Sequence, residues 1–103
     1  MSKKEDLVSI ITPSYNSSKF IEETVRSVQN QTYSNWELLI TDDCSTDNTF
    51  SILEKLAAKD ERIKIFKLAK NSGPAVARNN SIENAKGKYL VFLDSDNLRF
   101  NFQ

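Results

Sequence analysis

The sequence predicts an α/β fold, in which a mainly parallel β-sheet lies between helices in a Rossmann-like three-layer sandwich. The alternation of segments predicts the α/β class, and the composition predicts a globular domain. Four short apolar segments alternate with three segments of helical periodicity, and the connections between them are short. The chain of 103 residues has 39% hydrophobic and 27% charged residues, which is typical of a soluble globular domain. We therefore expect residues 1–103 to form a single domain.

The first half of the chain supplies two strands and two helices. Residues 7–12 form an apolar, β-branched run that Pro13 ends, and residues 36–41 form a second apolar run. Each run predicts a buried strand, and each is followed by apolar residues at helical spacing. Candidate N-caps are Ser17 or Ser18 for the first helix and Ser45, Thr46 or Asp47 for the second.

The second half supplies two further strands with a helix between them. Residues 62–68 alternate between apolar and polar side chains, which predicts a strand near a sheet edge. Pro74 suits the first position of a helix, and Gly87 suits the position just after its last turn. Residues 88–93 then form the fourth strand. The helix carries the apolar residues Val76, Ala77, Ile82 and Ala85.

The composition excludes several classes of function for this chain. It has no histidine, so it cannot form a Ser-His-Asp relay, a Cys-His relay or a histidine-based metal site. Its two glycines rule out a G-x-G-x-x-G fingerprint and a P-loop. With 14 basic and 14 acidic residues, no excess of positive charge indicates binding to nucleic acid. The single cysteine cannot form an internal disulfide, so we expect a cytoplasmic protein, free or at the inner face of the membrane.

Polar side chains gather where the predicted strands end. The first strand runs into residues 12–16, the second into Asp42 and Asp43, the third into residues 71–74 and the fourth into residues 94–96. In open parallel sheets, ligands bind beyond the carboxyl ends of the strands. The sequence therefore predicts a ligand site at this edge of the sheet.

The D-S-D segment after the fourth strand is the sharpest feature of this edge. Asp94 and Asp96 are two residues apart in an extended segment, so their carboxylates point to the same side. Two carboxylates held close together repel unless a cation lies between them, and Mg²⁺ or Mn²⁺ would then bridge them to a diphosphate. The alternative is a turn in which the acids and Ser95 cap the next element.

Other candidate residues each have two interpretations. Tyr15 offers a flat face for stacking a base, or it is a half-buried packing residue. Asp42 and Asp43 are a second metal pair or, as we favour, a loop acid and a hydrogen-bond acceptor suited to a pyrimidine N–H. Arg78 contacts a phosphate or is a solvated helix residue paired with a glutamate. Trp36 and Phe92 are expected in the core.

Taken together, two long stretches of the chain resemble family 2 glycosyltransferases of the GT-A fold. They are "VSIITPSYNSSKFIEETVRSVQNQTYSNWELLITDDCSTDNT" and "NSGPAVARNNSIENAKGKYLVFLDSDN". The resemblance implies the N-terminal half of that fold and binding of a nucleotide-diphosphosugar, most typically a UDP-sugar, with Mn²⁺ or Mg²⁺ as cofactor. It implies that Thr12, Pro13 and Tyr15 line the nucleotide pocket, that Asp43 binds the base and that Arg78 lies near the phosphates. It also implies that Asp96 holds the metal ion, and that Asp94 lies close to the sugar or the ion, with Ser95 between the two acids.

The sequence departs from the family pattern at two places. Cys44 stands where the family usually has glycine. The family usually continues past the D-x-D motif into an acceptor site and a catalytic base, whereas this sequence ends at Gln103. We therefore assign no catalytic residue, and we expect an inactive donor-binding region of a larger protein whose acceptor is a saccharide or a lipid-linked glycan.

The alternative is a non-catalytic fragment that associates with itself. Without a covering second half, apolar residues such as Phe92, Phe100 and Phe102 would be exposed and could form a homo-oligomer.

Overall fold

The computed structural model describes residues 6–94, so Ser95 and Asp96 of the D-S-D segment lie outside the described residues. Strands and helices alternate as the sequence predicts, which confirms the α/β class. The elements are β1 (Val8–Ser14), α1 (Ile21–Asn30), β2 (Trp36–Asp42), α2 (Thr49–Lys59), β3 (Ile63–Lys67), α3 (Pro74–Glu83) and β4 (Tyr89–Phe92).

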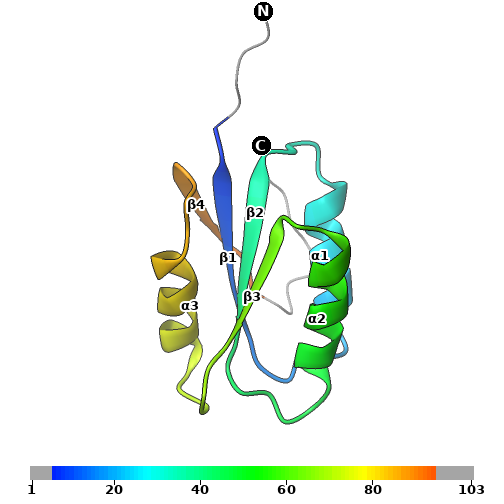
Figure 1. The fold of residues 1–103 in the computed structure, drawn as a ribbon, viewed down its shortest axis with the longest axis vertical. Helices are drawn as coiled ribbons and strands as arrows, with labels where there is room; N and C mark the ends of the chain where they lie inside the picture. The colour runs from blue at the N-terminus through cyan, green and yellow to red at the C-terminus, as the bar shows by residue number, and fades with distance from the viewer. Residues whose placement is uncertain (1–5, 95–103) are drawn as a thin grey trace, which may run out of the picture.

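The described strands form one parallel sheet in the order β3-β2-β1-β4. Helices α1 and α2 lie on one face of this sheet and α3 lies on the other, so the predicted three-layer arrangement is confirmed (Figure 1). β1 and β2 are central and almost wholly buried. β3 lies at an edge, as its alternating side chains predict.

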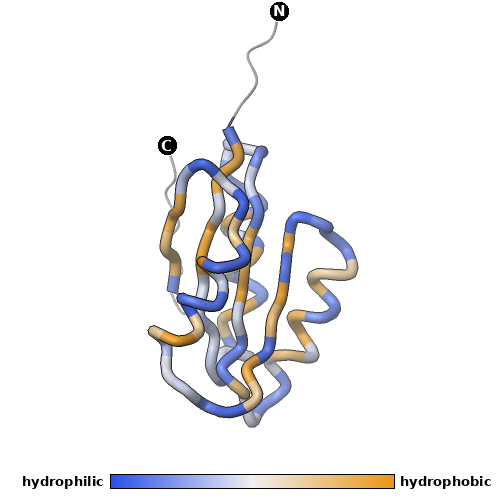
Figure 2. Tube along the Cα trace, turned by 60° about the vertical axis from the view of Figure 1, so that its left-hand side comes forward, coloured by the Kyte–Doolittle hydropathy of each residue, from blue (hydrophilic) through white to orange (hydrophobic). Residues whose placement is uncertain are grey.

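The main core lies between the sheet and the helices α1 and α2. Hydrophobic residues concentrate along the strands, while many of the connecting segments are hydrophilic (Figure 2). Trp36 is 2% exposed, and the guanidinium of Arg62 lies 3.8 Å from the centroid of its ring. The prediction that Trp36 belongs to the core is confirmed. Other members of the core are Val8, Ile10, Val25, Val28, Leu38, Ile40 and Leu53.

The prediction that Phe92 belongs to the core is wrong. Its side chain is 57% exposed. The reason is its place in the sheet: among the described strands, β4 pairs with β1 alone and forms an edge, and its neighbours Tyr89 and Leu90 are exposed as well. A hydrophobic run in the sequence cannot tell which strand will lie at an edge.

Helix α3 packs on the sheet through small and polar residues instead of an apolar face. Of the apolar residues that it was expected to carry, Val76 is 46% exposed, and the buried positions are Ala77 and Ser81. The hydroxyl of Ser81 lies 2.7 Å from that of Thr41 and donates to the carbonyl of Leu39 at 3.2 Å. Small side chains let the helix approach the sheet closely, and these hydrogen bonds satisfy the buried polar groups.

The helix caps differ from those predicted. No side chain caps α1; the Ser17 carbonyl oxygen instead accepts hydrogen bonds from the amides of Phe20 and Ile21. α2 begins after Asn48, and of the three candidates Asp47 serves its first turn, since its carboxylate accepts the Thr49 amide at 3.0 Å.

Gly87 does not end α3, because the helix stops at Glu83 with Asn84 as its C-cap. The Gly87 amide instead donates to the Ser9 hydroxyl at 2.8 Å, and its α-carbon lies against β1. Glycine occurs both at helix ends and where two backbones approach closely, and the sequence does not distinguish the two.

A buried carboxylate completes this contact between the α3–β4 connection and the sheet. Glu37 is 2% exposed, and its Oε2 accepts hydrogen bonds from the Ser9 hydroxyl at 2.6 Å and the Lys86 amide at 2.7 Å. Burial raises the pKa of Glu37, but the hydrogen bonds from Ser9 and Lys86 and the charge of Lys64 outweigh it, so the pKa lies below its ordinary value. The segment that leads to β4 is therefore tied to both central strands.

The Asp60 side chain, between α2 and β3, should make stability depend on pH in the acid range. It accepts hydrogen bonds from the Arg62 side chain and amide and from Gln29, and these lower its pKa from 3.8 to about 2. Because the pKa is lower in the folded state, the stabilisation is present above pH 4 and is lost as the pH falls towards 2. We expect Asp60→Asn to cost about 1–2 kcal/mol at pH 7, measured by urea unfolding.

The difference between wild type and Asp60→Asn should shrink when the same unfolding is repeated near pH 2. Glu22→Gln is the control, since the ion pair of Glu22 with Arg26 is exposed on both sides and should matter little. A difference at pH 7 that persisted unchanged at pH 2 would contradict the assignment to the Asp60 charge.

Candidate functional site

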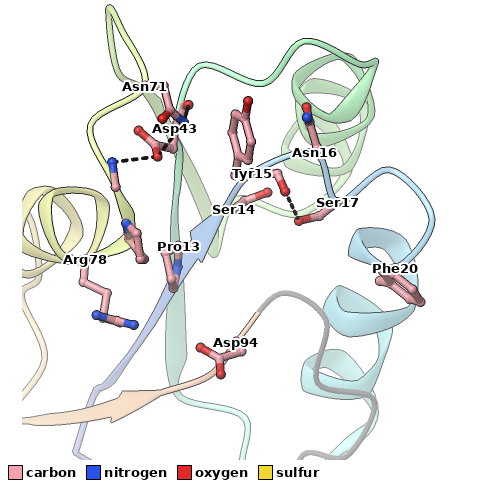
Figure 3. Close-up of a pocket in the computed structure, with 12 residues that line it drawn as sticks. Pro13, Ser14, Tyr15, Asn16, Ser17, Phe20, Asp43, Asn71, Arg78 and Asp94 are labelled. Atoms are coloured by element: carbon pink, nitrogen blue, oxygen red, sulfur yellow. Dashed lines mark hydrogen bonds between the residues drawn. The ribbon is translucent and has the colours of Figure 1, made fainter.

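A pocket of about 550 Å³ opens at the carboxyl edge of the sheet. The carboxyl end of each strand or the segment after it contributes: residues 13–17 at the end of β1 and just beyond it, Asp43 after β2, Asn71, Gly73 and Pro74 after β3, and Asp94 after β4. Arg78 enters from α3 (Figure 3). The predicted site at this edge therefore has a counterpart in the structure.

Tyr15 lies on the loop between β1 and α1 and lines the pocket. Its side chain is 46% exposed, so the ring is accessible and is not a core residue. The open ring face suits stacking of a planar group, which is the first of the two interpretations that the sequence allowed.

Asp43 holds the loop that precedes α3. It is 3% exposed, and its carboxylate accepts hydrogen bonds from the Ser72 amide at 2.7 Å, the Gly73 amide at 2.9 Å and the Asn71 side chain at 3.0 Å. A carboxylate offers about four acceptor positions, and these hydrogen bonds occupy three of them. Asp43 also lines the pocket, and the residues that hold it line the pocket beside it, namely Asn71 and Gly73.

Asp42 holds the loop that follows β2. It is fully buried, and its carboxylate accepts hydrogen bonds from the amide and the hydroxyl of Ser45. Asp42 does not line the pocket, whereas Asp43 does. This division matches the favoured interpretation of the pair as a loop acid and an acceptor. Within residues 6–94, no three acidic, histidine or cysteine side chains gather in a way that could hold a metal ion.

Arg78 and Asp94 also line the pocket. In Figure 3 both side chains lie on the side of Pro13 away from Asp43 and Tyr15. Among the described residues Arg78 has no carboxylate within salt-bridge distance, so the glutamate partner that the sequence allowed is not found there. The pocket thus has an aromatic end with a carboxylate and a second end with a guanidinium and a carboxylate.

The family model described as Glycosyl transferase family 2 matches residues 9–98. The chain belongs to this family. Its relatives include TuaG of Bacillus subtilis (strain 168), named as a glycosyltransferase of teichuronic acid biosynthesis. The two are 53% identical over 96 residues, which cover 93% of this chain and 38% of TuaG. The chain therefore spans well under half the length of this relative.

Solved structures of the family match the fold closely. S. aureus TarS 1–349 in complex with UDP has a TM-score of 0.80 and 39% identity, over 86% of this chain and 27% of that one. The mannosyltransferase PcManGT of Pyrobaculum calidifontis, in complex with GDP-Man and Mn²⁺, has a TM-score of 0.81 and 29% identity, over the same shares. The predicted GT-A fold is confirmed, and these two related proteins bind UDP and, with Mn²⁺, GDP-Man.

Most of the predicted site residues of this family 2 domain line the pocket, but not all of them do. Pro13, Tyr15, Asp43, Arg78 and Asp94 all line the pocket. Thr12 does not line it, because it lies on the buried central strand β1 with no exposed surface. Ser95 and Asp96 lie outside the described residues. The sequence predicted no individual ligand contact for several other residues that line the pocket, although some of them follow the strands at the predicted edge, namely Ser14, Asn16, Ser17, Phe20, Asn71, Gly73 and Pro74.

A signal for part of this missed set was present in the sequence. Asn71 and Gly73 follow the third strand at the same edge, which marks them as candidates, but the pairing of that loop with Asp43 spans 28 to 30 residues. Cys44, which replaces the usual glycine of the family, has φ 59° in the left-handed region that favours glycine.

Within residues 6–94, the domain has no helix with the length and apolar character needed to cross a bilayer.

Thr12→Val is expected to leave nucleotide binding unchanged and to keep or raise stability. The Thr12 hydroxyl is buried and has no hydrogen-bond partner in the part of the chain that the structure describes. Replacing it with a methyl group of similar size removes an unpaired polar group, worth up to about 1–2 kcal/mol. Thermal unfolding and calorimetric titration with UDP would check both points; a loss of affinity without a loss of stability would show that Thr12 contacts the ligand.

Proposed function

We propose that this chain is the donor-binding region of a glycosyltransferase that takes a UDP-sugar and transfers the sugar to an acceptor hydroxyl. The observation that carries the proposal is the pocket at the carboxyl edge, with Tyr15 and Asp43 at one end and Arg78 and Asp94 at the other. A nucleoside diphosphate has the same division, with a planar hydrogen-bonding base at one end and a charged diphosphate at the other.

The base belongs at the end formed by Tyr15 and Asp43. The exposed tyrosine ring stacks on a base, and the remaining acceptor position of Asp43 receives an N–H of the base. Uracil presents such an N–H, at N3 on its Watson–Crick edge, so UDP fits this end of the pocket. The complex of the related TarS with UDP supports this choice.

The diphosphate belongs at the end formed by Arg78 and Asp94. A guanidinium binds phosphate oxygens through paired N–H groups, and Arg78 has no competing carboxylate among the described residues. Asp94, together with Asp96, offers the oxygen ligands that Mn²⁺ and Mg²⁺ favour. Such an ion, when bound, would offset the charge that develops on the departing diphosphate.

Sugar transfer requires more than this pocket. The acceptor hydroxyl needs a binding site and a general base, and we assign no residue among 6–94 to either role. We therefore propose that they belong to a further part of the protein, which acts on a saccharide or a lipid-linked glycan. The isolated chain should bind the donor nucleotide weakly and transfer no sugar.

Calorimetric titration of the chain with UDP and Mn²⁺ tests the proposal. Saturable binding is expected, and it should weaken when EDTA replaces Mn²⁺. Tyr15→Ala should reduce the affinity about tenfold, because stacking on a base is worth about 1–3 kcal/mol. Tyr89→Ala is the matched control, since Tyr89 is 52% exposed and lies outside the pocket. Absence of saturable binding, or equal effects of the two variants, would overturn the proposal.

Self-association is a second candidate, which the exposed edge strand favours. Tyr89, Leu90 and Phe92 on β4 are 52%, 43% and 57% exposed, and edge strands with such side chains tend to pair with other chains. If this is the function, sedimentation should show a dimer that Phe92→Lys dissociates and that Asp43→Ala leaves intact. A monomer at all concentrations would exclude it.

A further inference from the structure

We propose that Asn16 is a positioning residue of the nucleotide site, which fixes the Tyr15 ring relative to the Asp43 carboxylate. This inference rests on the proposed function, since it concerns the end of the pocket that receives the base. The sequence placed Asn16 at the predicted ligand edge without an individual role, and in the structure it lines the pocket next to Tyr15.

Asn16 ties the loop after β1 to the loop after β2. Its side-chain Oδ1 accepts hydrogen bonds from the Thr46 amide at 2.8 Å, the Thr46 hydroxyl at 3.3 Å and the Asp47 amide at 3.3 Å. Its own amide donates to the Ser45 hydroxyl at 2.9 Å. A single residue therefore contacts three successive residues of the other loop.

Further contacts on both sides of Tyr15 join the same two loops. The Asp43 amide donates to the Ser14 carbonyl at 2.8 Å, and the Ser17 amide donates to the Thr49 hydroxyl at 2.9 Å. Tyr15 thus lies between backbone positions that are held to the loop carrying Asp43, while its ring stays 46% exposed. A backbone held in this way loses little conformational freedom when a ligand stacks on the ring that it carries.

The backbone of Asn16 explains why asparagine suits this position. Its φ is 49°, in the left-handed region that asparagine adopts more readily than most residues do. A replacement must therefore meet two separate requirements, a left-handed backbone and an acceptor oxygen. Glycine meets the first alone, aspartate meets both, and alanine meets neither.

The contacts of Asn16 should matter more for binding than for folding. They are exposed to solvent, where a hydrogen bond contributes about 0.5–1.5 kcal/mol to stability. Their loss should affect UDP affinity more than stability, because it changes the spacing of Tyr15 and Asp43, and small displacements of binding groups reduce complementarity to a ligand strongly. Binding of the diphosphate end should not depend on this spacing.

The test compares Asn16→Gly, Asn16→Ala and Asn16→Asp in calorimetric titrations with UDP and, separately, with pyrophosphate, both in the presence of Mn²⁺. Asn16→Gly and Asn16→Ala should weaken UDP binding about tenfold and leave pyrophosphate binding within twofold. Asn16→Asp, which keeps the acceptor, should retain most of the UDP affinity. Circular dichroism at the titration temperature ensures that each variant is compared in its folded state.

The outcomes separate this inference from the proposed function. If the wild-type chain binds no UDP, the proposed function fails and the role of Asn16 fails with it. If the wild type binds UDP and Asn16→Gly binds it equally well, or loses UDP and pyrophosphate to the same extent, the positioning role alone is overturned. Selective loss of UDP with rescue by aspartate would support it.

Discussion

Gly87→Ala is expected to destabilise the domain by about 3 kcal/mol or more, a large share of the roughly 5–15 kcal/mol that stabilises an ordinary domain. A β-carbon at this position would lie 2.5 Å from the Ser9 hydroxyl oxygen, 2.7 Å from the Ser9 amide nitrogen and 2.9 Å from the Leu7 carbonyl oxygen. Two of these atoms belong to the backbone, and Ser9 lies on the buried central strand β1, so neither can move away easily.

Gly73→Ala provides the matched comparison for Gly87→Ala in urea unfolding. Gly73 has φ 100°, and a β-carbon there would meet nothing within 4 Å. Its replacement should therefore cost the backbone strain alone, about 1–2 kcal/mol. Similar losses for the two variants, or a near-native Gly87→Ala, would show that β1 accommodates the added carbon.

Asp43→Ala is expected to abolish measurable UDP binding and to lower stability by about 2–3 kcal/mol. The substitution removes the acceptor proposed for the base, and it leaves the Ser72 amide, the Gly73 amide and the Asn71 side chain without their partner. Calorimetric titration with UDP and Mn²⁺ would measure the first effect, and urea unfolding the second.

Asn71→Ala separates the two roles of Asp43. It removes one donor to the carboxylate and keeps the carboxylate itself, so it should cost about 1 kcal/mol of stability and reduce UDP affinity only a few fold. Retention of wild-type UDP affinity by Asp43→Ala would show that the base does not contact Asp43.

The order of the elements could be predicted because parallel strands and their helices have distinct periodicities. The burial of Trp36 and the edge position of β3 followed from the same patterns. The exposure of Phe92 could not be predicted, since the sequence does not reveal that β4 lies at an edge of the described sheet. The packing of α3 also escaped prediction, because hydrogen bonds of Ser81 replace the apolar face that helical periodicity reveals.

The location of the pocket followed from topology, as parallel strands bring the segments after them to one edge. Tyr15, Asp43, Arg78 and Asp94 accordingly lie around one pocket. The contacts that hold these residues were not predictable, because they join loops about 30 residues apart and depend on three-dimensional geometry. Sequence reasoning therefore found the groups suited to contact a ligand but not the hydrogen bonds by which Asn16 joins the two loops.

The hydrogen bond between Gly87 and Ser9 joins residues 78 positions apart and has a consequence for synthesis on the ribosome. β1 is the first of the described strands to emerge, and its neighbour β4 is the last. The edge of β1 that pairs with β4 therefore stays unpaired while the intervening residues are translated. During that interval β2 and β3 can already assemble on the other side. Until β4 emerges, the nascent chain thus presents one unpaired edge of an apolar strand to chaperones and to neighbouring nascent chains.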